Sequence, residues 1–287
     1  MKKHIITALC LFVTLSTFAQ KKEKIKGNRE VTTVIYEIDP FTTLEVKEEL
    51  EIVLLNGETP KVEVIADENL HEIFNIDVID GTLSISTSKQ IRSSKKLEIY
   101  VTISKDLKRI HAENEAEFKS ATTLTIDKAE INVMDKAEMD LRIMSDSLAI
   151  NGFGKTKQRY EITTRELIVT AFEDAEIEAN ITASKVTSQV EFGEVQLKGQ
   201  TDVLYLEVKE KGEFIAHEFT VKEIHVTATE QAKVVLNCSD KITIDAHDRS
   251  EIDLLGSPKS IIMYKFEEEA VLRKISEANK SFLKRIF

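Results

Sequence analysis

Apolar and polar residues alternate along most of this chain, and the alternation is regular from Val31 onward. The stretches 42–46, 61–65, 82–86 and 97–103 place an apolar side chain at every second position and are rich in β-branched residues. A period of two is typical of a β-strand that buries one of its two faces. The pattern therefore predicts a chain that is almost entirely β-structure.

Two dipeptides near the beginning of the alternating region are strong turn signals. Asn56-Gly57 and Asp80-Gly81 each lie between two alternating stretches, and both are typical of tight β-hairpins. Together with the alternation, they predict an N-terminal β segment of antiparallel strands over residues 31–106.

From Leu107 onward the chain repeats a short unit: a small residue, then a polar or charged residue, then an apolar one. Successive copies lie about 19 residues apart, and a second apolar group falls between them. The clearest copies are Ala116-Glu117-Phe118, Ala137-Glu138-Met139, Ala175-Glu176-Ile177, Gly193-Glu194-Val195, Gly212-Glu213-Phe214, Ala232-Lys233-Val234 and Ser250-Glu251-Ile252, with weaker copies at Gly154-Lys155-Thr156 and Glu269-Ala270-Val271.

This period predicts that residues 107–275 form a single-stranded β-helix, or β-solenoid, with coils of about 19 residues. One coil cannot bury its apolar face alone, whereas coils stacked at the strand spacing of about 4.8 Å share a continuous core. Leucine-rich repeats have a similar period, but their asparagine ladder and strand-plus-helix consensus are missing. A plain antiparallel sandwich is the alternative, although its strands would be spaced less evenly.

The charged residue of the repeat is glutamate in six of the clearest copies, and these glutamates are the candidate surface of the solenoid. Stacked coils would place them in one column, where like charges about 5 Å apart repel one another. Such a column is tolerable only in water, so it is predicted to be exposed. The candidate exposed acidic column consists of Glu117, Glu138, Glu176, Glu194, Glu213 and Glu251.

The N-terminus has the three parts of a secretory signal peptide, which we place at residues 1–19. A short basic start precedes the apolar run Ile5 to Phe18, and Thr17-Phe18-Ala19 resembles a cleavage site. This predicts an exported protein that is periplasmic, outer-membrane-associated or extracellular, with no transmembrane segment after cleavage. Cleavage would also remove Cys10, so that Cys238 remains alone and no internal disulfide is predicted.

Two short segments flank the β-structure. Residues 20–30 are polar and charged, and we interpret them as a flexible lead-in. Residues 276–287 carry apolar side chains at helical spacing after Ser276, a plausible N-cap, and predict a short C-terminal helix that caps the last coil.

Composition and motifs exclude several classes of function. The net charge is −11 with no basic stripe, which disfavours nucleic acid as a partner. The histidines show no metal-ligand spacing, and calcium-binding repeats, nucleophile motifs and phosphate-binding loops are missing. We therefore predict no catalytic, cofactor-binding or metal-binding residues, no cofactor, and a protein that is not an enzyme.

A β-helix polysaccharide lyase or hydrolase is the enzymatic alternative. Asp135, Asp174 and Glu210 lie just before small residues of the repeat and supply carboxylates, which such enzymes need. However, every coil looks alike, so no unique cluster stands out. The chain also has no Trp and only 5 Tyr to stack on sugars.

Several segments resemble a family of exported bacterial proteins, the "putative auto-transporter adhesin, head GIN domain" family, common in Bacteroidetes. The resemblance covers roughly residues 31–275, and the leader ending in Phe18-Ala19-Gln20 is also typical of that phylum. The segments that carry it are FTTLEV (41–46), PKVEVIADENL (60–70), DGTLSI (80–85), VTISKDL (101–107), the repeats and GSPK (256–259).

The resemblance implies a right-handed β-solenoid exported to the cell envelope or beyond, without catalytic residues. In this sequence, alanine and acidic residues replace most of the Ser-Gly-Ser-Gly-like turns of the family. We expect a binding or adhesion module whose partner is an envelope glycan or protein. The alternatives are a structural envelope protein, favoured by smooth charged faces, and a polysaccharide lyase or hydrolase, favoured by a groove lined with acids, bases and aromatic residues. An exposed aromatic or apolar strip would favour binding.

Overall fold

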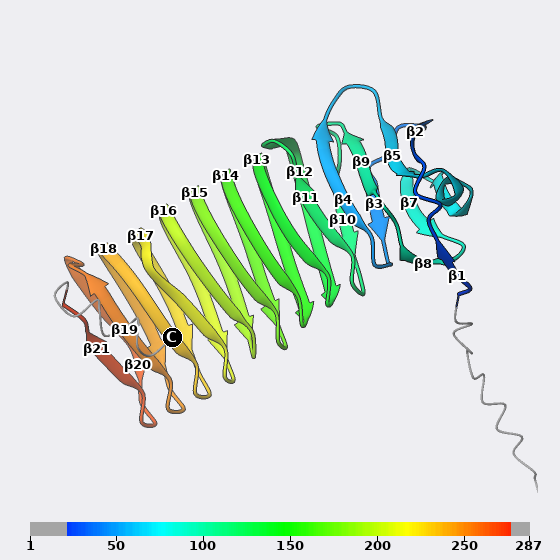
Figure 1. The fold of residues 1–287 in the computed structure, drawn as a ribbon. Helices are drawn as coiled ribbons and strands as arrows, with labels where there is room; N and C mark the ends of the chain where they lie inside the picture. The colour runs from blue at the N-terminus through cyan, green and yellow to red at the C-terminus, as the bar shows by residue number, and fades with distance from the viewer. Residues whose placement is uncertain (1–21, 277–287) are drawn as a thin grey trace, which may run out of the picture.

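The computed structural model of the chain describes residues 22–276, which form a stack of flattened coils (Figure 1). Strands make up 72% of the structure and helix 2%. The predicted all-β fold is therefore confirmed, and the strands wind into a β-solenoid of about nine turns.

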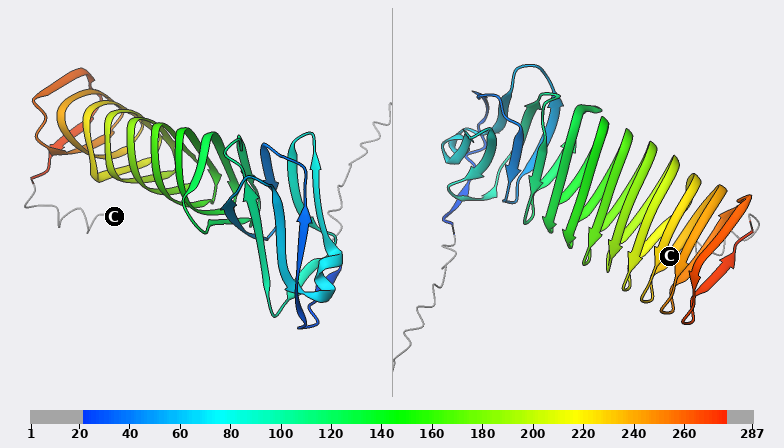
Figure 2. Two further views of the ribbon diagram at one scale, coloured as in Figure 1. Left: turned by 90° about the horizontal axis from the view of Figure 1, so that it is seen from above. Right: turned by 180° about the vertical axis from the view of Figure 1, so that it is seen from behind.

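Six consecutive long strands each form one whole coil. Each bends near its middle, so that the coil has two flat sides, as the view from above in Figure 2 shows. Each pairs in parallel with the next, so that Glu138 lies beside Lys157 and Lys157 beside Glu176. These strands are β13 (Glu138–Gly154), β14 (Lys157–Phe172), β15 (Glu176–Glu191), β16 (Glu194–Lys209), β17 (Glu213–Ala228) and β18 (Lys233–Ala246).

The two sides of the coils form two sheets that share one core. We call the sheet built from the first halves of β13–β18 the first sheet, and the sheet built from their second halves the second sheet. Shorter strands continue both sheets at either end: β10 (Arg109–Ala112), β11 (Glu117–Ser120) and β12 (Leu124–Asp135) before them, and β19 (Glu251–Gly256), β20 (Ser260–Phe266) and β21 (Val271–Lys274) after them.

The core consists of ladders in which each coil contributes the same kind of side chain at the same position. One ladder in the second sheet is aliphatic throughout and fully buried: Leu148, Leu167, Val186, Leu204, Ile224 and Ile242. The small residues of the repeat are also buried, at the turn that leads from the second sheet into the first. Stacking thus removes the apolar face of each coil from water, as the repeat predicts.

Most turns from the second sheet into the first use residues other than glycine in the left-handed conformation, although Gly154, beside Asp135 in the next coil, has a φ of 78°. Asp135 and Glu210 have φ values of 62° and 56°, and Asp248 at the same place in a later coil has 56°. Asparagine and aspartate adopt this conformation more readily than most residues. Two of the carboxylates considered for the enzymatic alternative, Asp135 and Glu210, therefore lie at this turn.

The N-terminal segment continues the two sheets and then closes them with antiparallel strands. β3 (Thr43–Val46) and β4 (Glu51–Asn56) stack in parallel on β10 and β11, so parallel stacking begins ahead of Leu107. β7 (Thr82–Thr87) and β9 (Leu97–Ile103) stack in parallel on β3 and β4. The predicted antiparallel pairs lie beyond them and involve β2 (Val31–Glu37), β5 (Lys61–Asp67) and β6 (Phe74–Ile79).

One of the two predicted hairpins is confirmed and the other is wrong. Asp80 and Gly81 join β6 to β7 with φ values of 49° and 74°, as a two-residue hairpin turn requires. Asn56-Gly57 does not form a hairpin, because β4 and β5 lie on opposite sides of β9 and pair with it instead. β9, which begins at Leu97, therefore lies between the two strands that flank this dipeptide.

Within the lead-in predicted at residues 20–30, the described residues 22–30 make specific contacts. β1 (Lys24–Lys26) pairs in parallel with β8 (Gln90–Ser93). Asn69, at the short 3-10 helix η1 (Glu68–Ile73), accepts a hydrogen bond of 2.8 Å from the Asn28 backbone and donates one of 2.9 Å to the Lys26 carbonyl. Polar side chains elsewhere in the fold thus hold the backbone of this segment.

A buried carboxylate, Asp67, also fixes the lead-in. It accepts hydrogen bonds from the backbone N–H groups of Arg29 at 3.0 Å, Lys95 at 3.1 Å and Lys96 at 3.2 Å. Burial raises the pKa of this carboxyl, but the hydrogen bonds together lower it by more than burial raises it. The pKa therefore lies below its ordinary value. The ionised side chain therefore stabilises the fold.

We expect the substitution Asp67→Asn to lower the Tm by several degrees at pH 7. Because the pKa is depressed in the folded state, the stabilisation is complete above the ordinary carboxyl pKa of about 3.9 and is lost as the pH falls below it. Thermal melts of both proteins at pH 7 and pH 3 measure the effect. The difference in Tm should shrink at pH 3, and an equal difference at both pH values would contradict the assignment.

Both predicted end segments lie outside the described residues: the signal peptide at 1–19 and the cap at 276–287 beyond Ser276. In the last described coil, β20 leaves its apolar side chains Ile261, Ile262 and Met263 exposed. Within residues 22–276 no helix is long and apolar enough to cross a membrane.

Candidate functional site

The six predicted glutamates form one ladder on the outer surface of the first sheet, which we call the ladder face. The strand register places Glu117 beside Glu138, and Glu176, Glu194 and Glu213 follow one another in consecutive coils. Glu251 continues the ladder toward the C-terminal end. Their side chains are exposed or half-exposed.

The ladder also contains two lysines, and one of them was missed in the sequence. Lys157 lies between Glu138 and Glu176, and Lys233 lies between Glu213 and Glu251. Lys157 was missed because the repeat in this coil is Thr156-Lys157-Gln158 and not Gly154-Lys155-Thr156. Even spacing was the available signal, since position 158 falls 19 residues after Met139 and 19 before Ile177.

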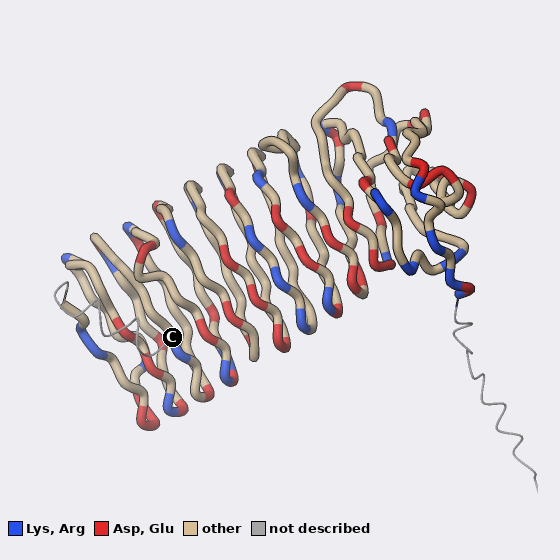
Figure 3. The backbone as a smooth tube through the Cα atoms, in the orientation of Figure 1, with Lys and Arg blue, Asp and Glu red and all other residues tan. Residues whose placement is uncertain are grey.

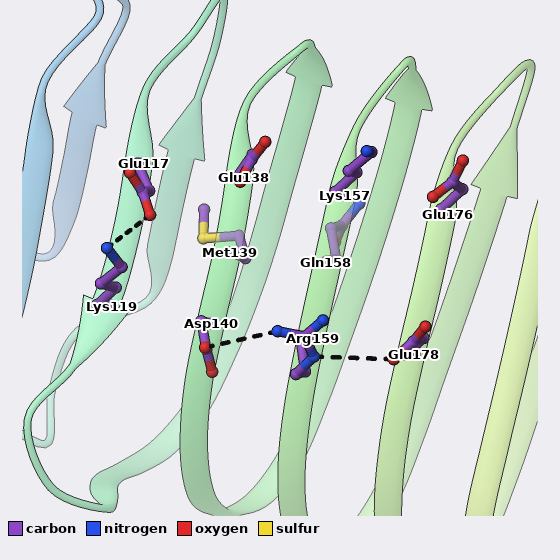
Figure 4. A pocket seen from close by; sticks show the side chains of 10 residues that line it. All are labelled: Glu117, Lys119, Glu138, Met139, Asp140, Lys157, Gln158, Arg159, Glu176 and Glu178. Carbon is purple, nitrogen blue, oxygen red and sulfur yellow. Dashed lines mark ion pairs between the residues drawn. The ribbon is translucent and has the colours of Figure 1, made fainter.

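A second row on the ladder face alternates in charge more strictly. Arg159 reaches the carboxylates of Asp140 at 3.9 Å and Glu178 at 3.7 Å, in the coils on either side. Lys119 pairs with Glu117 at 2.7 Å and with Glu51 of β4 at 2.9 Å. Figure 4 shows Glu117, Lys119, Asp140, Arg159 and Glu178 among the side chains around a hollow of about 340 Å³, and Figure 3 shows acidic and basic residues on neighbouring coils.

The ladder face therefore carries several ion pairs, together with a run of three adjacent glutamates, Glu176, Glu194 and Glu213. A charged ligand would gain little on this face, because an exposed ion pair contributes only about 0–1 kcal/mol. The observed register also leaves like charges side by side, because Glu117 lies beside Glu138, and Glu176, Glu194 and Glu213 are consecutive. We assign this face to solubility.

Glu194 is the least compensated member of the ladder, because Glu176 and Glu213 are its neighbours. Partial burial raises the pKa of Glu194, and the charges of Glu213 and Glu176 raise it further. We expect Glu194→Lys to raise the free energy of unfolding by about 0.2–1 kcal/mol at pH 7 and low salt.

Denaturant unfolding at low and high salt measures this gain. It should shrink in high salt, and also as the pH falls through the raised pKa and Glu194 becomes neutral. Glu138→Lys is the matched control, since Glu138 already lies between Glu117 and Lys157. Equal gains from both substitutions would argue against repulsion within the ladder.

The outer surface of the second sheet carries a different feature, a groove of about 430 Å³ that runs along the solenoid axis from β15 to β20. One wall is the row Thr187, Tyr205, His225 and Thr243, in which each residue lies beside the next in the neighbouring coil. The other wall is the row Gln189, Glu207, Thr227 and Asp245. We call this feature the groove.

The first wall of the groove is built around an aromatic stack. The rings of Tyr205 and His225 lie 4.9 Å apart with an interplanar angle of 10°. The ammonium of Lys185 lies 5.4 Å from the centroid of the Tyr205 ring, a cation–π distance. Tyr205 nevertheless remains 43% exposed, so that the edge of its ring and its hydroxyl face the solvent.

His225 is held in place by a charged neighbour in its own strand. Its Nε2 lies 3.2 Å from Oε1 of Glu223, which also accepts a hydrogen bond of 2.8 Å from Lys241. The hydrogen bond from Lys241 lowers the pKa of Glu223, so this carboxylate stays ionised. These contacts orient the His225 ring against Tyr205.

Tyr264 closes the C-terminal end of the groove. The register between β18 and β20 shifts at this point, because Ile244 lies beside Met263 and Asp245 beside Lys265. Tyr264 is thus an extra residue in a β-bulge, a device that re-aims a side chain. It is 83% exposed and lines the groove together with Tyr205 and His225.

The second wall of the groove is polar. Glu207 forms an ion pair with Lys209 of its own strand. Oδ1 of Asp245 is shut off from water and has no hydrogen-bond partner among residues 22–276. A buried acceptor without a donor is costly, but an oxygen that water does not reach is not open to a ligand either, so we give it no role in binding.

One group among the described residues offers three possible metal ligands within reach of one another: His247, Asp248 and Glu268. Nδ1 of His247 lies 2.6 Å from Oδ2 of Asp248 and 4.0 Å from Oε2 of Glu268. Hydrogen bonds from His247 and Glu268 lower the pKa of Asp248, and the contact with Asp248 raises the pKa of Glu268. These groups satisfy one another at a solvent-exposed turn, and we assign no metal to them.

A known family has the same sequence pattern over most of the chain. The profile described as "Putative auto-transporter adhesin, head GIN domain" matches residues 40–191 and, in a second match, residues 146–258. The chain belongs to this family. The overlap of the two matches fits a head GIN domain made of similar coils, which align to one profile in more than one register.

Solved structures of similar fold cover most of this head GIN domain. A "putative adhesin" from Parabacteroides distasonis ATCC 8503 has a TM-score of 0.60 and 19% identity, over 88% of this chain and 100% of its own. A "putative adhesin" from Parabacteroides merdae ATCC 43184 has a TM-score of 0.60 and 21% identity, over 88% of this chain and 99% of its own. A "putative lipid binding protein" from Parabacteroides distasonis ATCC 8503 has a TM-score of 0.58 and 18% identity, over 88% of this chain and 100% of its own. No curated protein matches the sequence.

Proposed function

We propose that this chain is an exported, non-catalytic binding module that acts in adhesion at the cell envelope. The observation that carries the proposal is the groove, where the Tyr205–His225 stack and Tyr264 are exposed side by side. Exposed aromatic side chains that gather in a hollow are typical of binding sites. The family described as adhesin-like supports the same role.

Export and envelope location are part of the proposal. They are supported by the signal peptide expected at residues 1–19 and by the membership of an adhesin-like family. The periplasm, the outer membrane surface and the extracellular space are all compatible with these observations.

The second candidate is a polysaccharide lyase or hydrolase, which the mixed lining of the groove favours. Such an enzyme needs a carboxylate pair, or a carboxylate with a base, that is free to exchange protons with the substrate. In the groove, Glu207 is paired with Lys209, and His225 contacts Glu223, itself paired with Lys241. These contacts favour binding over turnover.

The proposal is tested with the purified chain from Gln20 onward on an array of glycans and cell-wall fragments, together with an activity screen on polysaccharides. We expect retention on envelope material without turnover. Release of products from any polysaccharide would overturn the non-catalytic assignment, and no retention on any envelope material would overturn the binding role. The structural alternative predicts the second result.

A further inference from the structure

We infer that the groove binds a linear, neutral glycan, an inference that rests on the binding role proposed above and names its ligand. The groove crosses β15, β16, β17, β18 and β20, so at a coil spacing of about 4.8 Å it is about 19 Å long. It is therefore long enough for several sugar residues in a row. A shorter or rounder ligand would leave most of it empty.

The two walls match the two kinds of surface on a sugar. A pyranose ring presents an apolar C–H face and a rim of hydroxyls that donate and accept hydrogen bonds. The Tyr205–His225 wall offers aromatic ring edges and the Tyr205 hydroxyl, and the opposite wall offers Gln189, Glu207 and Asp245. A chain lying along the axis contacts both walls at once.

The ring faces determine where a sugar can stack. One contact of the Tyr205 ring is with His225 and another is with Lys185, so this ring meets a ligand with its edge and hydroxyl. Tyr264 has no stacked aromatic partner among the described residues and is 83% exposed. The stacking position is therefore at the Tyr264 end of the groove.

Charge disfavours an acidic polysaccharide. The charged side chains that line the groove, apart from His225, are the carboxylates of Glu207 and Asp245. The cations nearby are already engaged: Lys185 with the Tyr205 ring, Lys241 with Glu223, Lys209 with Glu207, and Lys265, beside Asp245, with Glu267. A uronic acid chain would bring negative charge to an acidic wall.

Backbone pairing disfavours an extended peptide. Peptides often bind sheets by adding a strand to an open edge, with main-chain hydrogen bonds. The groove lies across the interior of the second sheet, where β16, β17 and β18 are paired on both sides. Recognition there must use side chains, which suits a ligand rich in hydroxyls.

The experiment is calorimetric titration of the chain from Gln20 onward with three probes: chitohexaose and xylohexaose as neutral chains, and hexagalacturonate as the acidic chain. We expect one or both neutral chains to bind, and hexagalacturonate not to bind. Tyr205→Ala and Tyr264→Ala should each weaken binding ~10-fold. The matched control is Ile168→Ala, an exposed apolar residue in the same row as Tyr205 but outside the groove.

Thermal melts identify any variant that fails to fold, and Tyr264, in the last described coil, provides a test independent of Tyr205. The inference is overturned if only hexagalacturonate binds, if neither neutral chain binds, or if Ile168→Ala weakens binding as much as Tyr205→Ala. If the chain is retained on envelope material while both neutral probes fail, the glycan inference falls and the binding role stands. If nothing is retained at all, both fall.

Discussion

Removal of residues 156–174 is expected to leave a folded, shorter solenoid. The deletion takes out one coil and joins Lys155 to Ala175, which occupies the same turn position as Thr156. Glu176 then lies beside Glu138, where Lys157 lay before. At about 0.05–0.15 kcal/mol per residue, the free energy of unfolding should fall by about 1–3 kcal/mol.

Removal of residues 156–164 alone should have a far larger effect. This shorter deletion places a strand of the second sheet where the first sheet needs one, and inward and outward side chains no longer match. We expect loss of the cooperative transition, a cost of more than about 5 kcal/mol. Circular dichroism and denaturant unfolding compare the two variants, and equal stability of both would contradict the coil register.

The whole-coil deletion also separates fold from function. The groove lies on β15 to β20, outside the deleted residues. The shortened chain should therefore keep the binding of the intact chain. Loss of binding with intact folding would show that the ligand contacts more of the solenoid than the groove.

The substitution Gly199→Val is expected to be among the most damaging single changes at a position that is not in the aliphatic core. Gly199 has a φ of +99°, a backbone conformation that side chains with a Cβ rarely adopt. A Cβ at this position would overlap the carbonyl oxygen of Ile181 in the preceding coil and approach Oδ1 of Asn180 to 3.0 Å. The Ile181 carbonyl cannot move away, and the coils cannot separate, without disturbing the hydrogen bonds between the coils.

Backbone strain and steric overlap together should lower the free energy of unfolding by about 2–6 kcal/mol. The control is Gln200→Val, the same new side chain at the next, exposed position of β16. Denaturant unfolding of both variants gives the comparison. If Gly199→Val lies within about 0.5 kcal/mol of the control, the close approach at this position is not real.

The solenoid could be predicted because most coil positions repeat their chemistry. A buried small residue, an exposed charge and a buried apolar residue return every coil, so that sequence spacing alone reveals the stack. The prediction failed where a coil breaks this rule. In Thr156-Lys157-Gln158 the buried third residue is polar. The fold tolerates it there because Gln158 donates a hydrogen bond of 3.1 Å to Thr156 and accepts one of 2.8 Å from Tyr160.

The groove could not be predicted for the opposite reason. Its residues are exceptions to the repeat, and a search for recurring positions passes over them. Tyr205 and His225 are 20 residues apart in the sequence and meet only because the coils bring consecutive positions together. Tyr264 depends on a β-bulge, and the hydrogen-bond register that creates it is not visible in the residue pattern.

The central claim is that binding belongs to the groove and not to the ladder face. Substitutions on the two faces of the solenoid test this claim most directly. The measurement is retention of purified variants on envelope fragments, with Tyr205→Ala on the groove and Arg159→Ala on the ladder face as a pair of exposed residues on the two sheets. We predict that Tyr205→Ala loses most of the retention and that Arg159→Ala keeps it. Loss with Arg159→Ala and full retention with Tyr205→Ala would contradict the account.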